Sequence, residues 1–233
     1  MTTIPANLQA VQARILAACH AARRDAATVS LLAVSKTWPA DCVAEAAGAG
    51  QRAFGENYVQ EGVAKIAELA ARGIGGLEWH YTGPLQSNKT RLVAEHFAWV
   101  HSIERLKIAE RLSEQRPANL PPLNVCLQVN VSGEASKSGC APGEVAALAR
   151  AVAALPRLKL RGLMAIPEPT GDDTLLRGRF AALRQLRDQL NAGGLVLDTL
   201  SMGMSHDLES AIAEGSTIVR VGTAIFGERN YAT

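Results

Sequence analysis

The chain has 233 residues and a formal net charge of +2, with 48% hydrophobic and 20% charged residues. This apolar content suffices for a sizeable core and argues against a disordered chain. The small net charge and the scattered lysines and arginines disfavour a nucleic-acid or membrane surface as the partner. The N-terminus lacks the apolar core of a signal peptide, and no apolar stretch approaches the roughly 20 residues that span a bilayer. We therefore expect a cytoplasmic protein and, as the default, a monomer.

Short apolar runs alternate with longer amphipathic ones along the chain. A first helix is predicted over 6–24, where Leu8, Val11 and Ile15 share one face. The β-rich runs predict eight strands, at 31–36, 52–57, 78–83, 98–103, 124–131, 159–166, 199–204 and 217–222. The helices predicted between these strands lie at 40–49, 57–72, 87–95, 104–116, 143–155, 174–191 and 206–214.

This alternation indicates an α/β fold. Eight strands with intervening helices predict a single (β/α)8 TIM barrel over residues 1–233, with an additional N-terminal helix. Several strands are nearly continuous apolar runs, as expected for parallel strands covered on both faces. The alternative is a doubly wound open sheet, but no G-x-G-x-x-G motif follows the first strand. No linker rich in proline, glycine or serine marks a second domain.

Lys36 closes the first apolar run, so we predict that it lies at the end of the first strand. Lysine is rarely buried without a partner. Burial would lower its pKa and increase the fraction of neutral amine, which is the form that condenses with a carbonyl to give a Schiff base. The alternative is a lysine with a buried stem whose ammonium group reaches solvent.

The carboxyl ends of the strands form the active face of such a barrel. Phosphate sites there are typically built from the loops after strands seven and eight. The segments 201–205 and 222–223 place small residues and hydroxyls in these two loops, where they can donate hydrogen bonds to an anion. The same residue types also mark ordinary turns. Together with Lys36 on the opposite side of the rim, they predict a pocket for a phosphorylated carbonyl compound.

Five segments resemble the pyridoxal phosphate homeostasis protein family, in the same order and over nearly the whole chain. They are Ala33–Thr37, Phe54–Gln60, Trp79–Lys89, Ser201–Ser205 and Val219–Gly227. The resemblance implies the barrel of the N-terminal domain of alanine racemases, which here would bind pyridoxal 5′-phosphate (PLP) without an established reaction. It also implies a role in intracellular vitamin B6 homeostasis, with apo PLP-dependent enzymes as candidate partners.

The resemblance further implies roles at the matching positions. Lys36 would hold PLP as a Schiff base, Arg220 would face the pyridine nitrogen, and Asn57 would lie beside the ring. The residues implied to bind the phosphate are Ser205, Gly222 and Thr223. Lys137 also matches a family segment, and either assists loading or release of PLP or is a solvated loop residue.

The implied site favours a PLP carrier over a catalyst. A protonated arginine beside the pyridine nitrogen would oppose its protonation and weaken the ring as an electron sink. A racemase can tolerate this weaker electron sink, but it also needs acid/base groups on both faces of the substrate carbon. In the racemases that resemble this barrel, the opposing base comes from a second β-domain, whereas residues 229–233 end this chain just after the eighth strand. A PLP-dependent amino-acid racemase and a cofactor-free Schiff-base aldolase remain the alternatives.

Other candidate residues are expected to be structural. His80 and His101 lie on different strands without a matched carboxylate, so we expect packing or surface positions for them. Trp38 and Trp79 could border the pocket, but aromatic residues near a barrel rim usually belong to the core. No C-x-x-C pair or cysteine–histidine spacing predicts a metal site, and we expect reduced thiols at Cys19, Cys42, Cys126 and Cys140.

Overall fold

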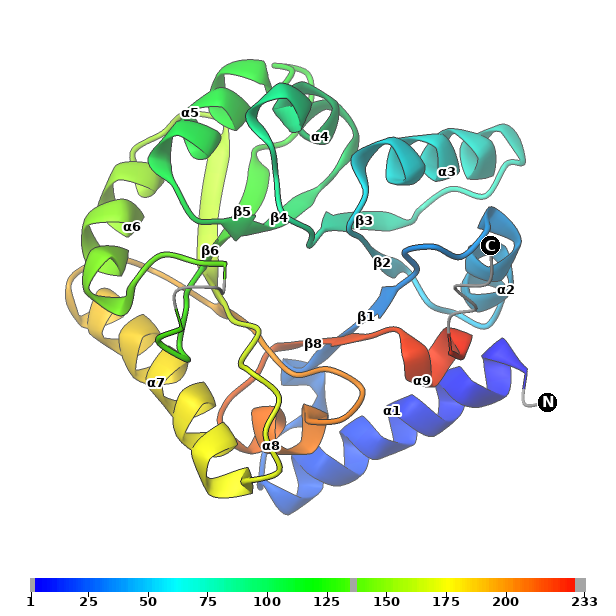
Figure 1. The fold of residues 1–233 in the computed structure, drawn as a ribbon. Coiled ribbons are helices and arrows are strands. Elements are labelled where there is room, and N and C mark those ends of the chain that lie inside the picture. Colours follow the sequence, from blue (N-terminus) through cyan, green and yellow to red (C-terminus); the bar gives the residue numbers. More distant parts are fainter. Residues whose placement is uncertain (1–2, 135–137, 229–233) are drawn as a thin grey trace.

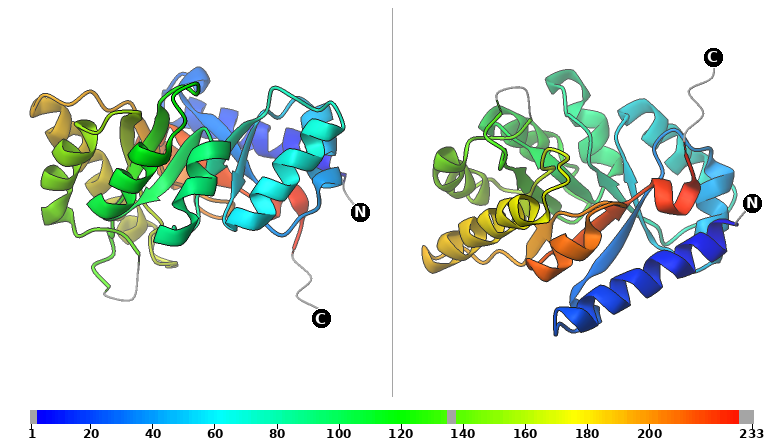
Figure 2. Two further views of the ribbon diagram at one scale, coloured as in Figure 1. Left: turned by 90° about the horizontal axis from the view of Figure 1, so that it is seen from above. Right: turned by 60° about the horizontal axis from the view of Figure 1, so that its bottom comes forward.

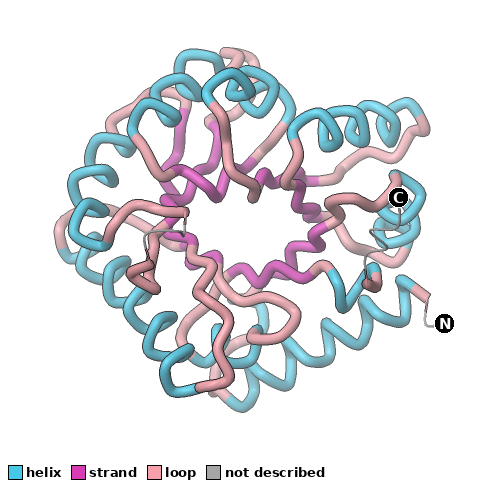
Figure 3. Tube along the Cα trace, viewed as in Figure 1, coloured by secondary structure: helices cyan, strands magenta, loops and turns pink. Residues whose placement is uncertain are grey.

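Eight parallel strands close into a barrel in chain order, with helices around the outside (Figures 1 and 3). The computed structural model describes residues 3–134 and 138–228. The strands are β1 Ser30–Val34, β2 Ala53–Glu56, β3 Glu78–Tyr81, β4 Trp99–Ile103, β5 Leu123–Gln128, β6 Leu158–Met164, β7 Thr199–Ser201 and β8 Ile218–Val221. The predicted TIM barrel is confirmed, and the open-sheet alternative is wrong, because β1 pairs with both β2 and β8.

The helices follow the predicted order, except that the last one, after the eighth strand, was not predicted. They are α1 Ile4–Ala21, α2 Ala40–Gly48, α3 Val59–Ala71, α4 Thr90–His96, α5 Leu106–Gln115, α6 Val145–Ala153, α7 Asp173–Ala192, α8 Leu208–Ala213 and α9 Thr223–Phe226. Short 3₁₀ helices lie at Ala26–Thr28, Ser87–Lys89 and Pro142–Glu144. Each helix buries one apolar face against the strands, and these faces form the main core around the barrel.

The N-terminal helix α1 covers the part of the outer barrel surface that the short helix α9 leaves uncovered. It begins after Thr3, whose hydroxyl accepts a hydrogen bond from the Ala6 backbone N–H. Its buried face carries Leu8, Val11 and Ile15, as the sequence predicts. The helix lies along α8, α9 and α2 (Figure 2, right), so it closes the outer layer where the last strand meets the first.

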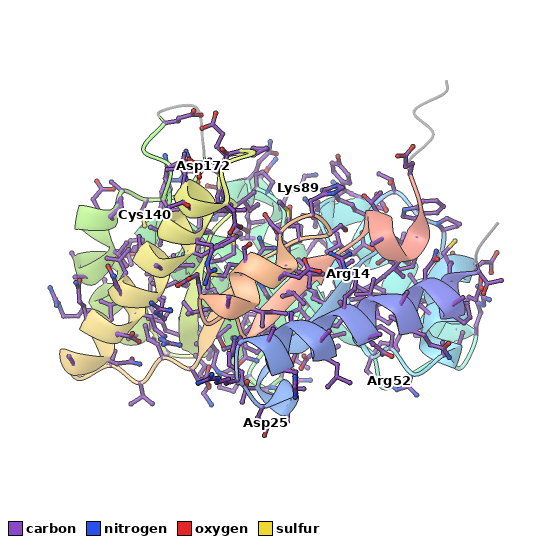
Figure 4. All side chains as sticks on the ribbon, turned by 90° about the horizontal axis from the view of Figure 1, so that it is seen from below. Arg14, Asp25, Arg52, Lys89, Cys140 and Asp172 are labelled. Carbon is purple, nitrogen blue, oxygen red and sulfur yellow. The ribbon has the colours of Figure 1, made fainter. Side chains whose placement is uncertain are left out.

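The two ends of the barrel are distinct. Figure 4 shows Asp25 and Arg52, which precede strands, at one end, and Lys89 and Asp172, which follow strands, at the other. Except for β4, which ends at Ile103 as predicted, the strands stop earlier than predicted at this second end. For example, β1 ends at Val34 rather than at residue 36, because the chain leaves the ladder in a turn.

Closure of the barrel also corrects one predicted placement. We expected Lys36 and the phosphate loops on opposite sides of the rim. Instead β1 and β8 are neighbours, paired from Ser30 with Ile218 to Ala33 with Val221. The turn that holds Lys36 therefore lies beside the loop that follows β8.

Gly162 on β6 is required for strand pairing. A Cβ added there would collide with the backbone carbonyl of Thr199 on the neighbouring β7. We expect Gly162→Ala to lower the free energy of unfolding by about 1–3 kcal/mol or more, as overpacking does. Gly178→Ala on α7 is the control, because no atom lies within 4 Å of its added Cβ. Urea unfolding of both variants tests this, and equal stabilities would contradict it.

Candidate functional site

A cavity of about 180 Å³ opens at the carboxyl ends of the strands. All six residues predicted for the site line it, namely Lys36, Asn57, Ser205, Arg220, Gly222 and Thr223. The cavity is also lined by residues to which no individual role was predicted, namely Val34, Thr82, Ile166, Met204 and His206, of which Met204 lies within the predicted segment 201–205. Most of these are sequence neighbours of predicted residues, so a wider window around each strand end would have included them.

Lys36 lies in a tight turn directly after β1 and is half-buried. The Ser35 backbone N–H still donates to the Gly55 carbonyl of β2, at 2.9 Å. The Trp38 N–H then donates back to the Ser35 carbonyl at 3.1 Å. Thr37 has a φ of 68°, a left-handed conformation that is costly for a β-branched residue. The surrounding structure must therefore hold this turn in place.

A buried ion pair lies beneath the turn. The Lys65 ammonium of α3, whose side chain is 4% exposed, contacts the fully buried Glu56 carboxylate at 2.6 Å. Glu56 also accepts from the Ser35 hydroxyl at 2.6 Å, while its Oε2 has no hydrogen-bond partner among the described residues. Burial raises the pKa of Glu56, and Lys65 acts against that rise.

Helix α3 fixes the backbone on both sides of Lys36. Lys65 Nζ donates to the Ser35 carbonyl at 2.9 Å. The Glu61 carboxylate accepts the Thr37 N–H at 2.6 Å, and it also contacts Lys65 at 3.1 Å. The peptide groups before and after Lys36 are thus tied to a single helix. This arrangement holds the left-handed turn and positions the Lys36 side chain at the cavity.

Arg220 reaches the cavity from β8 and is 5% exposed. Its Nη1 donates to the Ser201 hydroxyl at 2.7 Å, and its Nη2 donates to the Ala165 carbonyl at 2.9 Å. Burial lowers the pKa of Arg220 to about 10, which still leaves the guanidinium protonated near neutral pH. It is therefore a fixed cationic donor.

Behind Arg220, two histidines meet inside the barrel. His80 Nδ1 and His101 Nε2 are 2.9 Å apart, and His80 Nε2 lies 2.9 Å from the Glu78 carboxylate. Burial lowers the pKa of both imidazoles. The expectation that no carboxylate matches them was wrong. Glu78 lies two residues before His80 on the same strand, and this i, i+2 spacing was the signal available in the sequence.

The Asn57 side chain is oriented by a neighbour from the next strand. The Thr82 hydroxyl, which follows β3, donates to Asn57 Oδ1 at 2.9 Å. Because the amide oxygen is engaged there, the Nδ2 amide is the donor that Asn57 can offer to a ligand in the cavity.

The loops after β7 and β8 meet at the cavity. The Ala224 N–H lies 3.4 Å from the Ser205 hydroxyl, which joins the two loops. A Cβ added at Gly222 would lie 3.1 Å from the Val34 carbonyl, so glycine allows β8 to stay close to β1 here. The first N–H groups of α9 have no acceptor inside the helix. Hydroxyl and backbone donors are therefore concentrated at this corner.

Comparisons with known proteins match this architecture. The sequence model described as alanine racemase, N-terminal domain, matches residues 6–230. A Pseudomonas aeruginosa protein named pyridoxal phosphate homeostasis protein is 65% identical over 231 residues, which cover 99% of this chain and 98% of the relative. The chain belongs to the pyridoxal phosphate homeostasis protein family.

Solved structures agree with the family assignment. PipY of Synechococcus elongatus PCC7942, described with PLP bound, is 39% identical to this chain and has a TM-score of 0.80. The match covers 93% of this chain and 100% of PipY. An alanine racemase from Corynebacterium glutamicum has a TM-score of 0.66, over 92% of this chain and 62% of its own. Its identity of 19% shows a shared fold only.

Several other predictions concern absences or undescribed residues. Lys137 and residues 229–233 lie outside the described part of the chain. Within 3–134 and 138–228, no group of three or more histidine, cysteine or acidic side chains is placed to hold a metal ion. No helix in these ranges combines the length and apolarity needed to cross a bilayer.

We expect Lys65→Met to destabilise the protein, because it leaves Glu56 buried without its cation. Removing one partner of a buried ion pair typically costs about 3–5 kcal/mol. Lys107→Met on α5 is the control, since Lys107 is exposed and should change stability by less than about 0.5 kcal/mol. Urea unfolding measures both, and adding Glu56→Gln to Lys65→Met should recover part of the loss. Equal stabilities for the two lysine variants would contradict a structural role for the ion pair.

The buried histidines predict loss of stability in mild acid. Below the unfolded-state pKa of about 6.5, the unfolded chain binds protons that the folded chain excludes, because burial lowers the pKa of His80 and His101. The free energy of unfolding should therefore fall as pH decreases from about 7.5 to 5.5, by up to about 1.4 kcal/mol per pH unit for each histidine. A His101→Gln variant should show a smaller decline, because one of the two buried imidazoles is absent. Parallel declines in the two proteins would be inconsistent with this origin.

Proposed function

We propose that this protein binds PLP in the cavity at the carboxyl end of the barrel and serves PLP homeostasis as a carrier. The observation that supports this most strongly is the order of the cavity residues around the rim. Asn57 follows β2, Lys36 follows β1, and Gly222 and Thr223 follow β8, on three adjacent strands. In PLP the hydroxyl, the aldehyde and the phosphate arm are borne by three consecutive ring carbons. The order of residues around the rim matches the order of groups around the ring.

The chemistry of the donors fits each group of the cofactor. PLP supplies an aldehyde, which condenses with a primary amine to form a C=N bond and release water. Lys36 is the amine of the cavity, and Asn57 offers an amide donor to the neighbouring hydroxyl. Ser205 adds a hydroxyl donor to the phosphate corner at Gly222 and Thr223.

Arg220 favours holding the cofactor over catalysis. Its guanidinium is fixed by Ser201 and Ala165 and stays protonated near neutral pH. Facing the ring nitrogen, it can only donate a hydrogen bond, and this disfavours protonation of that nitrogen. The ring is then a weak electron sink, which disfavours reactions at the substrate α-carbon.

We favour a PLP carrier over a PLP-dependent racemase and over a cofactor-free aldolase. Curated relatives such as the Pseudomonas aeruginosa and Escherichia coli proteins are named for pyridoxal phosphate homeostasis. The likeness to alanine racemases is at 14–19% identity and supports the fold alone. We propose a monomer whose recipients are apo PLP-dependent enzymes.

Lys36→Ala should abolish covalent binding of PLP. The wild type, incubated with PLP, should gain visible absorbance, and mass spectrometry after borohydride reduction should place a pyridoxyl group on Lys36. Lys89→Ala is the matched control, because Lys89 lies at the same end of the barrel but does not line the cavity. A pyridoxyl group elsewhere in the wild type, or an unchanged spectrum in Lys36→Ala, would refute the assignment.

A transfer assay then tests the carrier function with the same proteins. PLP-loaded wild type should restore the activity of an apo PLP-dependent enzyme, whereas Lys36→Ala treated identically should carry no PLP to transfer. Interconversion of alanine enantiomers by the loaded wild type would favour the racemase instead.

A further inference from the structure

A continuous line of hydrogen bonds crosses the inside of the barrel from the cavity to the opposite end. Arg220 Nη1 and the Ser201 hydroxyl are 2.7 Å apart, and the same hydroxyl is 2.7 Å from His101 Nδ1. His101 Nε2 is 2.9 Å from His80 Nδ1, and His80 Nε2 is 2.9 Å from the Glu78 carboxylate. Glu78 is the first residue of β3, whereas the cavity lies beyond the carboxyl ends of the strands.

The chemistry of the two ends fixes the direction of every link. The Glu78 carboxylate can only accept, so neutral His80 carries its proton on Nε2 and accepts at Nδ1. His101 therefore donates its Nε2 proton to His80 Nδ1, and its own Nδ1 accepts the Ser201 hydroxyl proton. At the other end Arg220 can only donate, and the Ser201 oxygen accepts from it. One arrangement of protons satisfies all five side chains.

Burial prevents the protons along this line from adopting another arrangement. Ser201 and His101 are 0% exposed and His80 is 3% exposed, so water cannot replace a lost partner within the line. A second proton on His80 would set two N–H groups against each other between the rings, and a second proton on His101 would face the Ser201 hydroxyl proton. Glu78 is the accessible end, with a side chain that is 52% exposed.

Aromatic packing fixes the ring planes of the line. The Trp99 ring stacks on His80 with a centroid distance of 5.2 Å and an interplanar angle of 5°. The Arg161 guanidinium lies 4.7 Å from the centroid of the Trp99 ring, and Arg161 is paired with Asp198 at 2.7 Å. His80 therefore cannot turn away from His101 without disturbing this stack.

We propose that Glu78 is a positioning residue for bound PLP, acting through His80, His101 and Ser201 to hold the Arg220 guanidinium toward the ring. The proposal rests on the proposed PLP site. The carboxylate terminates the line as its acceptor. Without an acceptor at this position, the His80 Nε2–H is left unpaired, and both histidines can change tautomer. The Ser201 hydroxyl then loses its fixed acceptor, and Ser201 no longer orients Arg220, which is left with the Ala165 carbonyl as its remaining fixed contact among the described residues.

The first test uses the protein without PLP, so it does not depend on the proposed function. Nitrogen-15 NMR of the imidazole rings should show His80 and His101 both neutral and both protonated on Nε2 at neutral pH. In Glu78→Met at least one of the two should lose this uniform tautomer. A proton on Nδ1 of either histidine in the wild type, or unchanged tautomers in Glu78→Met, overturns the proposal.

The second test compares three variants at two exposed acids, Glu78 and Glu110. Glu78→Met should weaken PLP binding roughly three- to tenfold, as loss of one aligned hydrogen bond would, and should shift the absorbance maximum of the bound cofactor. Glu78→Gln keeps an acceptor oxygen for His80 and should remain close to wild type in both measurements. Glu110→Met, at an exposed position on α5, is the control.

The PLP-binding measurements distinguish failure of the positioning role of Glu78 from failure of the proposed function. If the wild type binds PLP and Glu78→Met binds it as tightly as Glu110→Met does, the positioning role is wrong and the proposed function stands. If the wild type binds no PLP, the proposed function fails and the positioning role fails with it, whatever tautomers NMR reports.

Discussion

The pairing of β1 with β8 is the contact on which the site depends. It closes the barrel, and it places the turn that holds Lys36 beside the loop that carries Gly222. The close approach between Gly222 and the Val34 carbonyl leaves no room for a larger residue without a shift. An amine and a group of anion donors that lie nearly 200 residues apart in sequence become neighbours at one corner of the rim. A ligand with an aldehyde and a phosphate arm on adjacent carbons fits that corner.

Two buried cations, Lys65 and Arg220, support this corner. The barrel balances their positive charges in different ways. Lys65 meets a carboxylate directly, and the same group of side chains ties the peptides on both sides of Lys36. Among the described residues, Arg220 donates hydrogen bonds to the neutral oxygens of Ser201 and Ala165, and the nearest acid along its line of hydrogen bonds is Glu78, four links away. Direct pairing stabilises a strained turn. The neutral line leaves the Arg220 charge free to act on a ligand.

Much of the fold could be predicted from the sequence, because alternation of apolar runs and amphipathic helices is a local property. The position of Lys36 near the first strand end also follows from local pattern. The closeness of Lys36 to Gly222 does not, since it depends on closure of the sheet. The pairing of His80 with His101 depends on register between β3 and β4 and on the inward direction of both side chains. Period-two alternation places Glu78 and His80 on one face, but it does not identify the partner across the strand.

The exposure of the cavity agrees with reversible holding of a cofactor. Lys36 is half-buried, and the cavity lining includes exposed side chains at Ile166, His206 and Thr223. Condensation of an amine with an aldehyde releases water, so access of water is what permits the reverse step. Of the residues proposed to orient the ring, Arg220 is buried and Asn57 is half-buried, whereas the groups around the amine are partly open. In the proposed site, this combination would fix the cofactor in one orientation and still allow it to leave, as a carrier requires.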